Sequence, residues 1–125
     1  GITGVIMNSQ TVDIFNPKTI RATMGSIFRV PFVYVPDLAP VLEQMHAKGI
    51  HTYAAHLKGQ KYYDSFSFRE PTAFLIGNEG NGLSKEISDQ AGQYLKIPME
   101  GRVESLNASI AAALLMYEAH RQRSL

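Results

Sequence analysis

The chain has 125 residues, of which 45% are hydrophobic and 18% charged; this is room for one domain and excludes an intrinsically disordered chain. Twelve Lys and Arg against eleven Asp and Glu give a net charge of +1, which excludes the strongly basic surface of a self-sufficient nucleic-acid binder. Cysteine is absent, so disulfide scaffolds, cysteine-ligated metals and thiol nucleophiles are excluded.

The first part of the chain alternates between strand and helix signals. An apolar run at 2–7 predicts a buried strand, and because this strand follows the first residue almost directly, we expect a chain truncated on its N-terminal side. Asn16 followed by Pro17 is typical of a helix start and predicts a helix over 17–24. A β-branched and aromatic run at 32–35 predicts the next strand.

The same alternation continues downstream. An apolar stripe predicts a second helix that ends at Gly49, where glycine suits the left-handed conformation after a helix. The remaining predicted elements are a strand at 50–55, a strand at 72–76, a helix at 84–91, a strand at 94–97 and a helix at 106–120. Strands separated by helices are typical of a parallel sheet, so we predict an α/β fold with a parallel sheet flanked by helices. Apolar runs stay short of the roughly 20 residues that span a bilayer, and we expect a cytoplasmic protein.

A glycine-rich segment follows the strand predicted at 72–76. Residues 77–82 read G-N-E-G-N-G and stand where open α/β sheets place their ligands, after the carboxyl end of a parallel strand. The spacing matches neither the dinucleotide-binding pattern G-x-G-x-x-G nor the phosphate loop G-x-x-x-x-G-K-[ST]. A ligand-binding loop and a plain tight connection therefore both remain open.

A second polar segment, 97–107, leads from the strand at 94–97 to the last helix. Ser105 suits the N-cap of that helix, because its hydroxyl can accept a bond from a backbone N–H. Asn107 would then lie inside the first turn, where the helix offers it no obvious capping role.

These two segments carry a resemblance to a known family. Residues 74–84 resemble the second signature of the SpoU-type RNA 2′-O-ribose methyltransferases, and 97–99 together with 105–113 resemble the third. The order of the two signatures and their separation along the chain agree with the family. Residues 12–26 also resemble the stretch before the family's second strand, so the resemblance covers nearly the whole chain.

The resemblance implies both a fold and an activity. The fold is an α/β domain of the SPOUT class, with a parallel sheet and a deep trefoil knot near its C-terminus. The family binds S-adenosylmethionine inside the knot, works as a homodimer and transfers the methyl group to a ribose 2′-hydroxyl of tRNA or rRNA. We therefore expect residues 1–125 to form a single SpoU-like methyltransferase domain, N-terminally truncated, with no metal and no membrane partner.

The matched motifs also imply site residues. Gly77, Ile97 and Leu106 are expected to contact the cofactor through their backbones, and Gly77 would let the main chain come close because it has no Cβ. The full set expected around the cofactor is Ala54, Leu75, Gly77, Asn78, Gly80, Ile97, Met99, Ser105 and Leu106. Asn107 and Glu79 match polar motif positions and are the expected catalytic residues. Asn107 is expected to organise cofactor and substrate, since an amide takes up no proton at neutral pH.

One departure from the family keeps an alternative open. The first signature, an Asn, Gly and Arg on a strand–helix turn, has no match in these 125 residues, and its arginine is the residue thought to activate the 2′-hydroxyl. A non-catalytic SPOUT-like module that binds cofactor or RNA and dimerises is therefore the alternative. An unrelated Rossmann-like nucleotide binder is a third possibility, against which the missing G-x-G-x-x-G counts.

Three further groups of residues have a structural interpretation beside a functional one. Histidines recur every five residues at His46, His51 and His56, a spacing that does not predict a metal site. Loop aromatics could stack bases, although packing on the core is favoured; they are Tyr62, Tyr63, Phe66 and Phe68. An apolar face of the last helix is either core or a dimer contact; it consists of Leu106, Ile110, Ala113, Leu114 and Tyr117.

Overall fold

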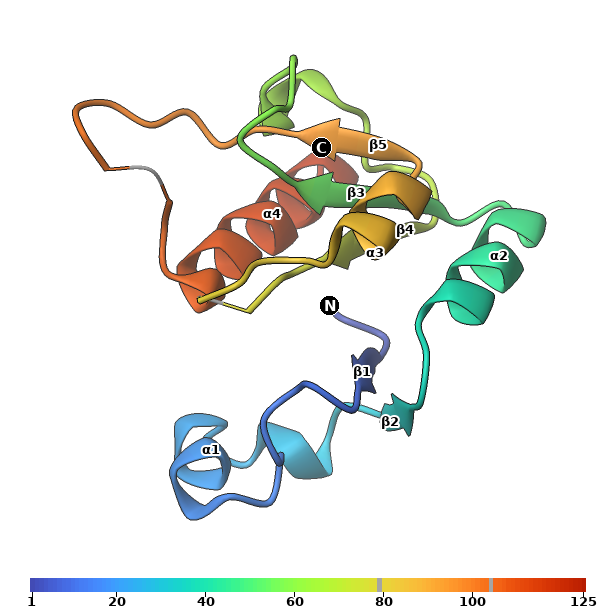
Figure 1. Ribbon diagram of the computed structural model, residues 1–125, viewed down its shortest axis with the longest axis vertical. Coiled ribbons are helices and arrows are strands. Elements are labelled where there is room, and N and C mark those ends of the chain that lie inside the picture. The colour runs from blue at the N-terminus through green and yellow to red at the C-terminus, as the bar shows by residue number, and fades with distance from the viewer. Residues whose placement is uncertain (79, 104) are drawn as a thin grey trace. The chain divides into compact units, whose positions relative to one another are not determined.

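The computed structural model describes residues 1–78, 80–103 and 105–125, and its chain divides into two compact units. Unit 1 is Gly1–Leu38 and unit 2 is Ala39–Leu125 (Figure 1). The pairings between strands are parallel, which confirms the α/β class. Each unit has its own set of paired strands, two in unit 1 and three in unit 2. Alternation of strands and helices indicates the direction of the strands, but it does not say which strands pair.

Unit 1 contains the predicted order of strand, helix and strand, but the first strand, which the sequence predicts to be buried, buries only Met7. Its elements are β1 (Val5–Asn8), α1 (Pro17–Ala22), the short 3₁₀ helix η1 (Ser26–Phe28) and β2 (Phe32–Val35). The predicted helix start is confirmed, because the side chain of Asn16 accepts a hydrogen bond from the backbone N–H of Lys18 at 2.9 Å. The helix ends earlier than predicted, and the chain turns through Gly25, whose φ is +87°, into η1.

Unit 2 carries the remaining elements. In chain order they are α2 (Ala39–Ala47), β3 (His51–Ala55), the 3₁₀ helix η2 (Tyr63–Ser65), β4 (Thr72–Leu75), α3 (Lys85–Gln90), β5 (Gln93–Leu95) and α4 (Ala108–Arg123). Gly49, two residues after the end of α2, has a φ of +75°, as its predicted position at the helix end requires. The last strand is shorter than predicted, and α4 begins and ends later than the predicted 106–120.

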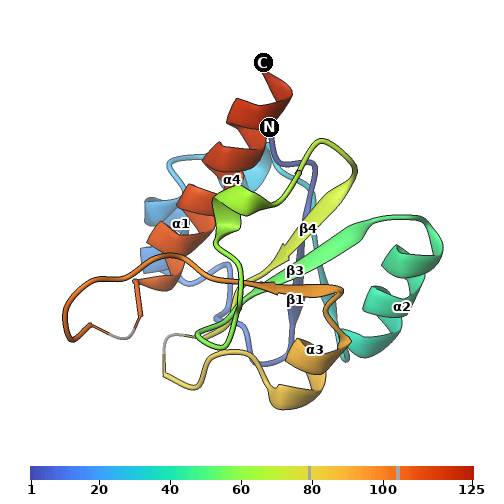
Figure 2. The same ribbon diagram turned by 90° about the horizontal axis from the view of Figure 1, so that it is seen from above.

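The sheet of unit 2 has the order β4-β3-β5, with helices on both faces (Figures 1 and 2). Successive residues of β3 point to opposite faces. The hydroxyl of Thr52 lies 2.8 Å from Nε2 of His46 in α2 and accepts a bond from the N–H of Gly92, which follows α3. Tyr53 belongs to the core on the α4 side. His46 thus has a hydrogen-bond partner inside unit 2.

The hydrophobic core lies between this sheet and α4. Its buried members are Tyr53, Phe68, Leu95, Leu115 and Ala119. Phe68 is fully buried, and its ring centroid lies 5.1 Å from that of Tyr53 and 5.0 Å from that of Phe74, both edge to face. These rings bring a large apolar area into contact inside unit 2.

The loop aromatics divide between core and surface. Phe68 is buried, and Tyr63 and Phe66 pack against the core, so the packing interpretation is confirmed for them. Tyr62 remains 50% exposed.

The buried face of α4 is not the apolar face that the sequence indicates. Ile110, Leu114 and Tyr117 are exposed, with Tyr117 at 74%, so their interpretation as core is wrong. The residues that α4 buries are Leu115, Ala119 and Gln122. Both sets have the same helical spacing, and the sheet covers the second set because Leu115 and Ala119 meet its aromatic core.

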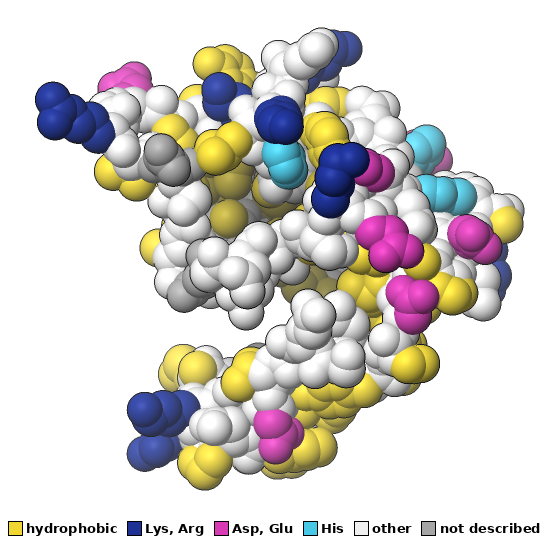
Figure 3. All heavy atoms as spheres, in the orientation of Figure 1, with side chains coloured by type: hydrophobic (Ala, Val, Ile, Leu, Met, Phe, Trp, Pro, Cys, Tyr) yellow, Lys and Arg dark blue, Asp and Glu magenta, His cyan; other side chains and the backbone are white. Residues whose placement is uncertain are grey.

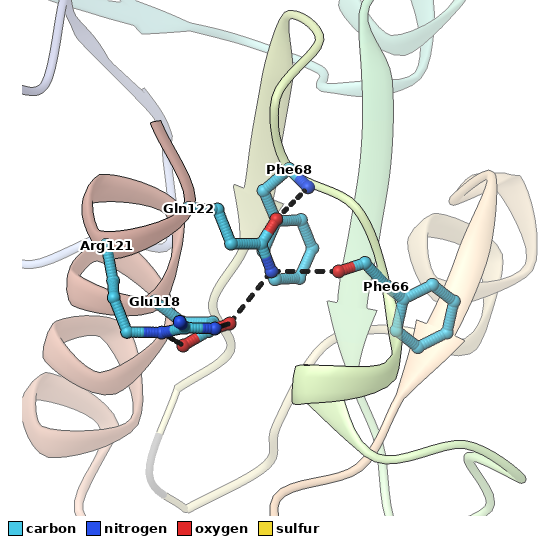
Figure 4. Close-up of polar contacts among 5 residues, drawn as sticks. All are labelled: Phe66, Phe68, Glu118, Arg121 and Gln122. Atoms are coloured by element: carbon cyan, nitrogen blue, oxygen red, sulfur yellow. Dashed lines mark hydrogen bonds and ion pairs between the residues drawn. The ribbon is translucent and has the colours of Figure 1, made fainter. Parts of the chain in front are cut away.

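Gln122 joins α4 to the segment before β4 (Figure 4). Its side-chain oxygen accepts a bond from the N–H of Phe68 at 2.6 Å, and its nitrogen donates to the carbonyl of Phe66 at 2.9 Å. The same nitrogen donates to Glu118, which in turn accepts two bonds from the guanidinium of Arg121. These bonds with Arg121, and then that with Gln122, lower the pKa of the Glu118 carboxyl to about 2.

Candidate functional site

A cavity of about 290 Å³ lies in unit 2 where the parallel strands end. Where β3, β4 and β5 end, it is lined by the last residue of β3 and by residues that follow the three strands: Ala55, His56, Leu57, Ile76, Gly77, Lys96 and Ile97. The loop after β4 and the segment that leads into α4 complete it with Asn78, Gly82, Leu83, Met99, Ser105, Leu106, Ala108 and Ala111. Open α/β sheets bind ligands at this edge, and the volume is close to the lower end, about 300 Å³, of small-molecule sites.

The glycine-rich loop is folded back on itself at the cavity wall. The N–H of Gly82 donates to the carbonyl of Asn78 at 2.7 Å, and the side chain of Asn78 accepts a bond from the N–H of Gly80 at 2.7 Å. Gly82 has a φ of +64°, a conformation that favours glycine. The segment is therefore a tight connection that also lines a cavity, which combines the two possibilities that the spacing left open.

Gly77 is required by the loop itself. A Cβ at this position would clash with the carbonyl carbon of Gly82 and the nitrogen of Leu83. The resemblance predicts that the absence of a Cβ at Gly77 lets the backbone approach a cofactor. In the structure, the atoms next to this position belong to Gly82 and Leu83 of the returning loop.

The cap of α4 also differs from the expectation. Asn107, and not Ser105, is the N-cap: its side-chain oxygen accepts bonds from the N–H of Ser109 at 2.9 Å and of Ile110 at 3.4 Å. The helix therefore begins at Ala108, two residues beyond the predicted start. Ser105 precedes the helix and lines the cavity, whereas Asn107 stands between two lining residues, Leu106 and Ala108.

One wall of the cavity carries polar aromatic groups. The imidazole of His56 accepts a bond at Nδ1 from the N–H of Lys58 and stacks on the ring of Tyr94, with centroids 4.9 Å apart. The hydroxyl of Tyr94 donates to Asp89 at 2.9 Å. This bond raises the pKa of the Tyr94 hydroxyl and, together with Lys85, lowers the pKa of the Asp89 carboxyl.

The cavity brings together most of the residues expected around a cofactor. Those that line it are Gly77, Asn78, Ile97, Met99, Ser105 and Leu106. Ala54 and Leu75 are buried register partners in neighbouring strands, one position before the lining residues, and Gly80 lies in the turn of the glycine loop. None of these three is among the described lining residues. Glu79, expected to be catalytic, lies outside the described residues.

Some lining residues were missed from the sequence. Ile76 and Lys96 directly follow β4 and β5, and His56 follows β3 in the same way. His56 and Lys96 lie outside the two matched segments, whereas Ile76 lies inside residues 74–84 but is not among the expected site residues. The signal that the three share is the first position beyond a strand.

Within residues 1–78, 80–103 and 105–125, no group of three or more His, Asp or Glu side chains is arranged to hold a metal ion. In the same described ranges, no helix is long and apolar enough to cross a bilayer.

The chain matches known proteins along nearly its whole length. Residues 1–117 match the model of the SpoU rRNA Methylase family. A protein of Staphylococcus haemolyticus named for the TrmH family of tRNA/rRNA methyltransferases is 36% identical over 123 residues, which are 98% of this chain and 49% of that protein. The chain thus spans about half the length of the curated relatives it matches.

Solved structures agree with the sequence matches. An S-adenosylmethionine-bound rRNA methyltransferase of Sinorhizobium meliloti superposes with a TM-score of 0.89 at 36% identity, over 97% of this chain and 46% of that one. An RNA 2′-O ribose methyltransferase superposes with a TM-score of 0.87 at 32% identity, over 100% of this chain and 48% of that one. The chain therefore belongs to the SpoU rRNA methylase family.

Proposed function

We propose that the cavity of unit 2 binds S-adenosylmethionine. We propose further that the chain takes part in the methylation of a ribose 2′-hydroxyl of tRNA or rRNA. The observation that carries the proposal is one cavity at the ends of β3, β4 and β5, lined by residues of both matched signatures. The bound cofactor in the Sinorhizobium meliloti structure and the 2′-O ribose specificity of the other neighbour support it.

The lining residues suit an adenosine-type ligand. Ile76, Ile97 and Met99 provide apolar walls for a flat ring, and Leu106 adds to them from the segment before α4. Ser105 provides a hydroxyl at the same wall. S-adenosylmethionine, when bound, supplies the methyl group that is transferred.

We assign Asn107 as a positioning residue. Its side-chain oxygen accepts hydrogen bonds from the N–H groups of Ser109 and Ile110, so Asn107 fixes where α4 begins. That start decides how Leu106 and Ala108 are presented to the cavity. Holding reactants in the correct geometry accounts for much of the rate gain in such transfers. Glu79 stays a prediction as a catalytic residue, and so does a cytoplasmic location.

A homodimer is also part of the proposal. Ile110 and Leu114 are exposed at 53% and 37% on one face of α4, followed by Tyr117. A helix face of this kind needs an apolar partner, and a second copy of α4 provides one by two-fold symmetry. We expect Leu114→Glu to shift the chain from dimer to monomer in sedimentation velocity, whereas Leu125→Glu, at the exposed C-terminus, leaves it dimeric. A monomeric parent chain would contradict this part.

The trefoil knot remains a proposal based on the family resemblance. It is supported by the way in which the loop after β4 and the segment leading into α4 line one cavity, as the two crossing parts of a knot would. A crystal structure that traces 76–84 and 96–107 decides it.

Calorimetric titration with S-adenosylhomocysteine tests the cofactor site. We expect saturable binding to the parent chain and its loss in Leu106→Arg, because a long cationic side chain would fill the apolar cavity. Leu125→Arg is the matched control, since Leu125 is 79% exposed. Equal binding by Leu106→Arg and the parent, with both folded by circular dichroism, would remove the site from this cavity.

Two further readouts separate the alternatives. Competition by adenosine monophosphate with equal strength would favour a general nucleotide binder. Cofactor binding without methyl transfer to total tRNA or rRNA would favour the non-catalytic module.

A further inference from the structure

A group of lysines gathers at the rim of the cavity. The carbonyl of Lys61 accepts a bond from the N–H of Lys96 at 2.9 Å, so the loop after β3 lies against the end of β5. The N–H of Lys58 is bound to the ring of His56 at 3.0 Å. Because His56 and Lys96 line the cavity, the group begins at the cavity wall and extends outward to Lys58 and Lys61.

The lysines of this group are in none of the ion pairs of the described residues, although the acidic Asp64 follows Tyr62 by two positions. Lys58 and Lys61 are exposed. In the described part of the chain, the ion pairs are Lys85–Asp89 and Arg121–Glu118, which include none of these lysines. Asp89 is a nearby acidic group, since the charge of Lys58 contributes to its lowered pKa, but Asp89 is already bonded to Tyr94. Figure 3 shows dark-blue side chains gathered near a histidine on the face of unit 2 turned to the viewer.

An exposed aromatic ring lies within the same group. Tyr62 pairs with Lys96 in a parallel β-bridge, which holds its backbone in place. The neighbouring Tyr63 packs on the core, whereas Tyr62 keeps 50% of its surface exposed. An aromatic ring between lysines is the arrangement by which proteins hold single-stranded nucleic acid, with bases on the ring and phosphates on the cations.

We propose that Lys58, Lys61 and Tyr62 form a contact surface for single-stranded RNA beside the cofactor cavity. The inference rests on the proposed function, because it takes RNA as the substrate. A base next to the reacting nucleotide stacks on Tyr62, and the lysines contact the phosphates on either side. The net charge of +1 keeps the affinity of the 125-residue chain low, so the contact orients the strand and contributes modest binding.

The charge arm of the test uses a fluorescent oligouridylate and fluorescence anisotropy at low salt. The double variant Lys58→Gln, Lys61→Gln is compared with Lys18→Gln, Lys48→Gln, which removes the same charge from exposed positions elsewhere. We expect the first pair to lower the slope of log Kd against log salt by about 0.7 for each phosphate that is no longer neutralised, and the second pair to leave it unchanged. Equal slopes in the two double variants would overturn the assignment.

The stacking arm uses Tyr62. Tyr62→Ala is expected to weaken binding about tenfold, the size of one base stacked on an aromatic ring, and Tyr62→Phe to bind like the parent. Unchanged affinity in Tyr62→Ala would overturn the stacking role. Equal binding of an RNA duplex of the same length would overturn the preference for single strands.

Calorimetry with S-adenosylhomocysteine on the same variants keeps the two proposals apart. If the variants still bind the cofactor and none of them changes the RNA affinity, the proposed RNA contact surface is refuted and the proposed function stands. If the parent chain does not bind the cofactor, but its RNA affinity depends on Lys58, Lys61 and Tyr62, the cofactor site is refuted and the RNA contact surface stands.

Discussion

The two units differ in how far they bury their own apolar side chains. In unit 2, Phe68, Leu95 and Leu115 are fully buried in one core. In unit 1, the buried hydrophobic side chains among the described residues are Met7 and Ile27, while Phe28 is 85% exposed. Both units contain well-formed strands and a capped helix, so local signals produced regular elements in each. The difference shows that elements alone do not make a core; burial requires a second apolar layer.

Polar contacts follow the same division. Unit 2 closes its core with the hydrogen bonds of Gln122 and with the Glu118–Arg121 pair. In unit 1, the hydroxyl of Tyr34 in β2 accepts a bond from the N–H of Ile14 and donates to the carbonyl of Val12, which joins the loop after β1 to β2. We therefore expect stability to depend mainly on unit 2.

The largest effect is expected from matched phenylalanine truncations. Phe68→Ala removes a fully buried ring with three aromatic neighbours and is expected to lower the free energy of unfolding by about 3–5 kcal/mol. Phe28→Ala removes an exposed ring of unit 1 and is expected to change it by less than about 0.5 kcal/mol. Urea denaturation measures both. A large loss in Phe28→Ala would show that this ring is covered in solution.

A smaller effect is expected at Gln122. Replacing it by Ala leaves the N–H of Phe68 and the carbonyl of Phe66 without their bonds in a buried position, which costs about 1–3 kcal/mol. Gln10→Ala, at an exposed position of unit 1, is the control and should be neutral. Equal stability of the two variants in urea would mean that water replaces Gln122.

The smallest effect is a pH dependence. The pKa of Glu118 falls from an ordinary 4.5 to about 2 on folding, so its contribution is present above pH 4.5 and is lost as the pH falls from there toward 2. We expect Glu118→Gln to lose less stability than the parent between pH 6 and pH 3. Arg121→Gln, which removes the main cause of the lowered pKa, should behave in the same direction. If the free energy of unfolding changes with pH in the same way in the parent and both variants, Glu118 is not the source of the pH dependence.

The sequence predicted the local structure well where one residue type satisfies a local requirement. The Asn16–Pro17 start of α1 and the glycine after α2 are of this kind, because each depends on neighbouring backbone atoms. The predicted cap of α4 is wrong for a related reason. Ser105 and Asn107 both suit an N-cap, and the path of the preceding segment along the cavity decides between them.

The site was predictable in part. Motif resemblance named lining residues such as Gly77, Ile97 and Leu106, but it also named Ala54 and Leu75, which are buried one position before the cavity. The resemblance did not name His56 and Lys96, because whether a residue lines the cavity depends on where three separate strands end together.

The sequence by itself determined the order of strands and helices, their parallel direction and the segments that meet at the cavity. The tertiary structure decided which face of α4 is buried, what Gly77 makes room for and which strands pair within each unit. Local features are encoded by residues a few positions apart. Packing depends on which residues, distant in the sequence, lie against a given face of an element. Leu115 is buried instead of Leu114 because the aromatic core of β3 and β4 lies on its side of the helix.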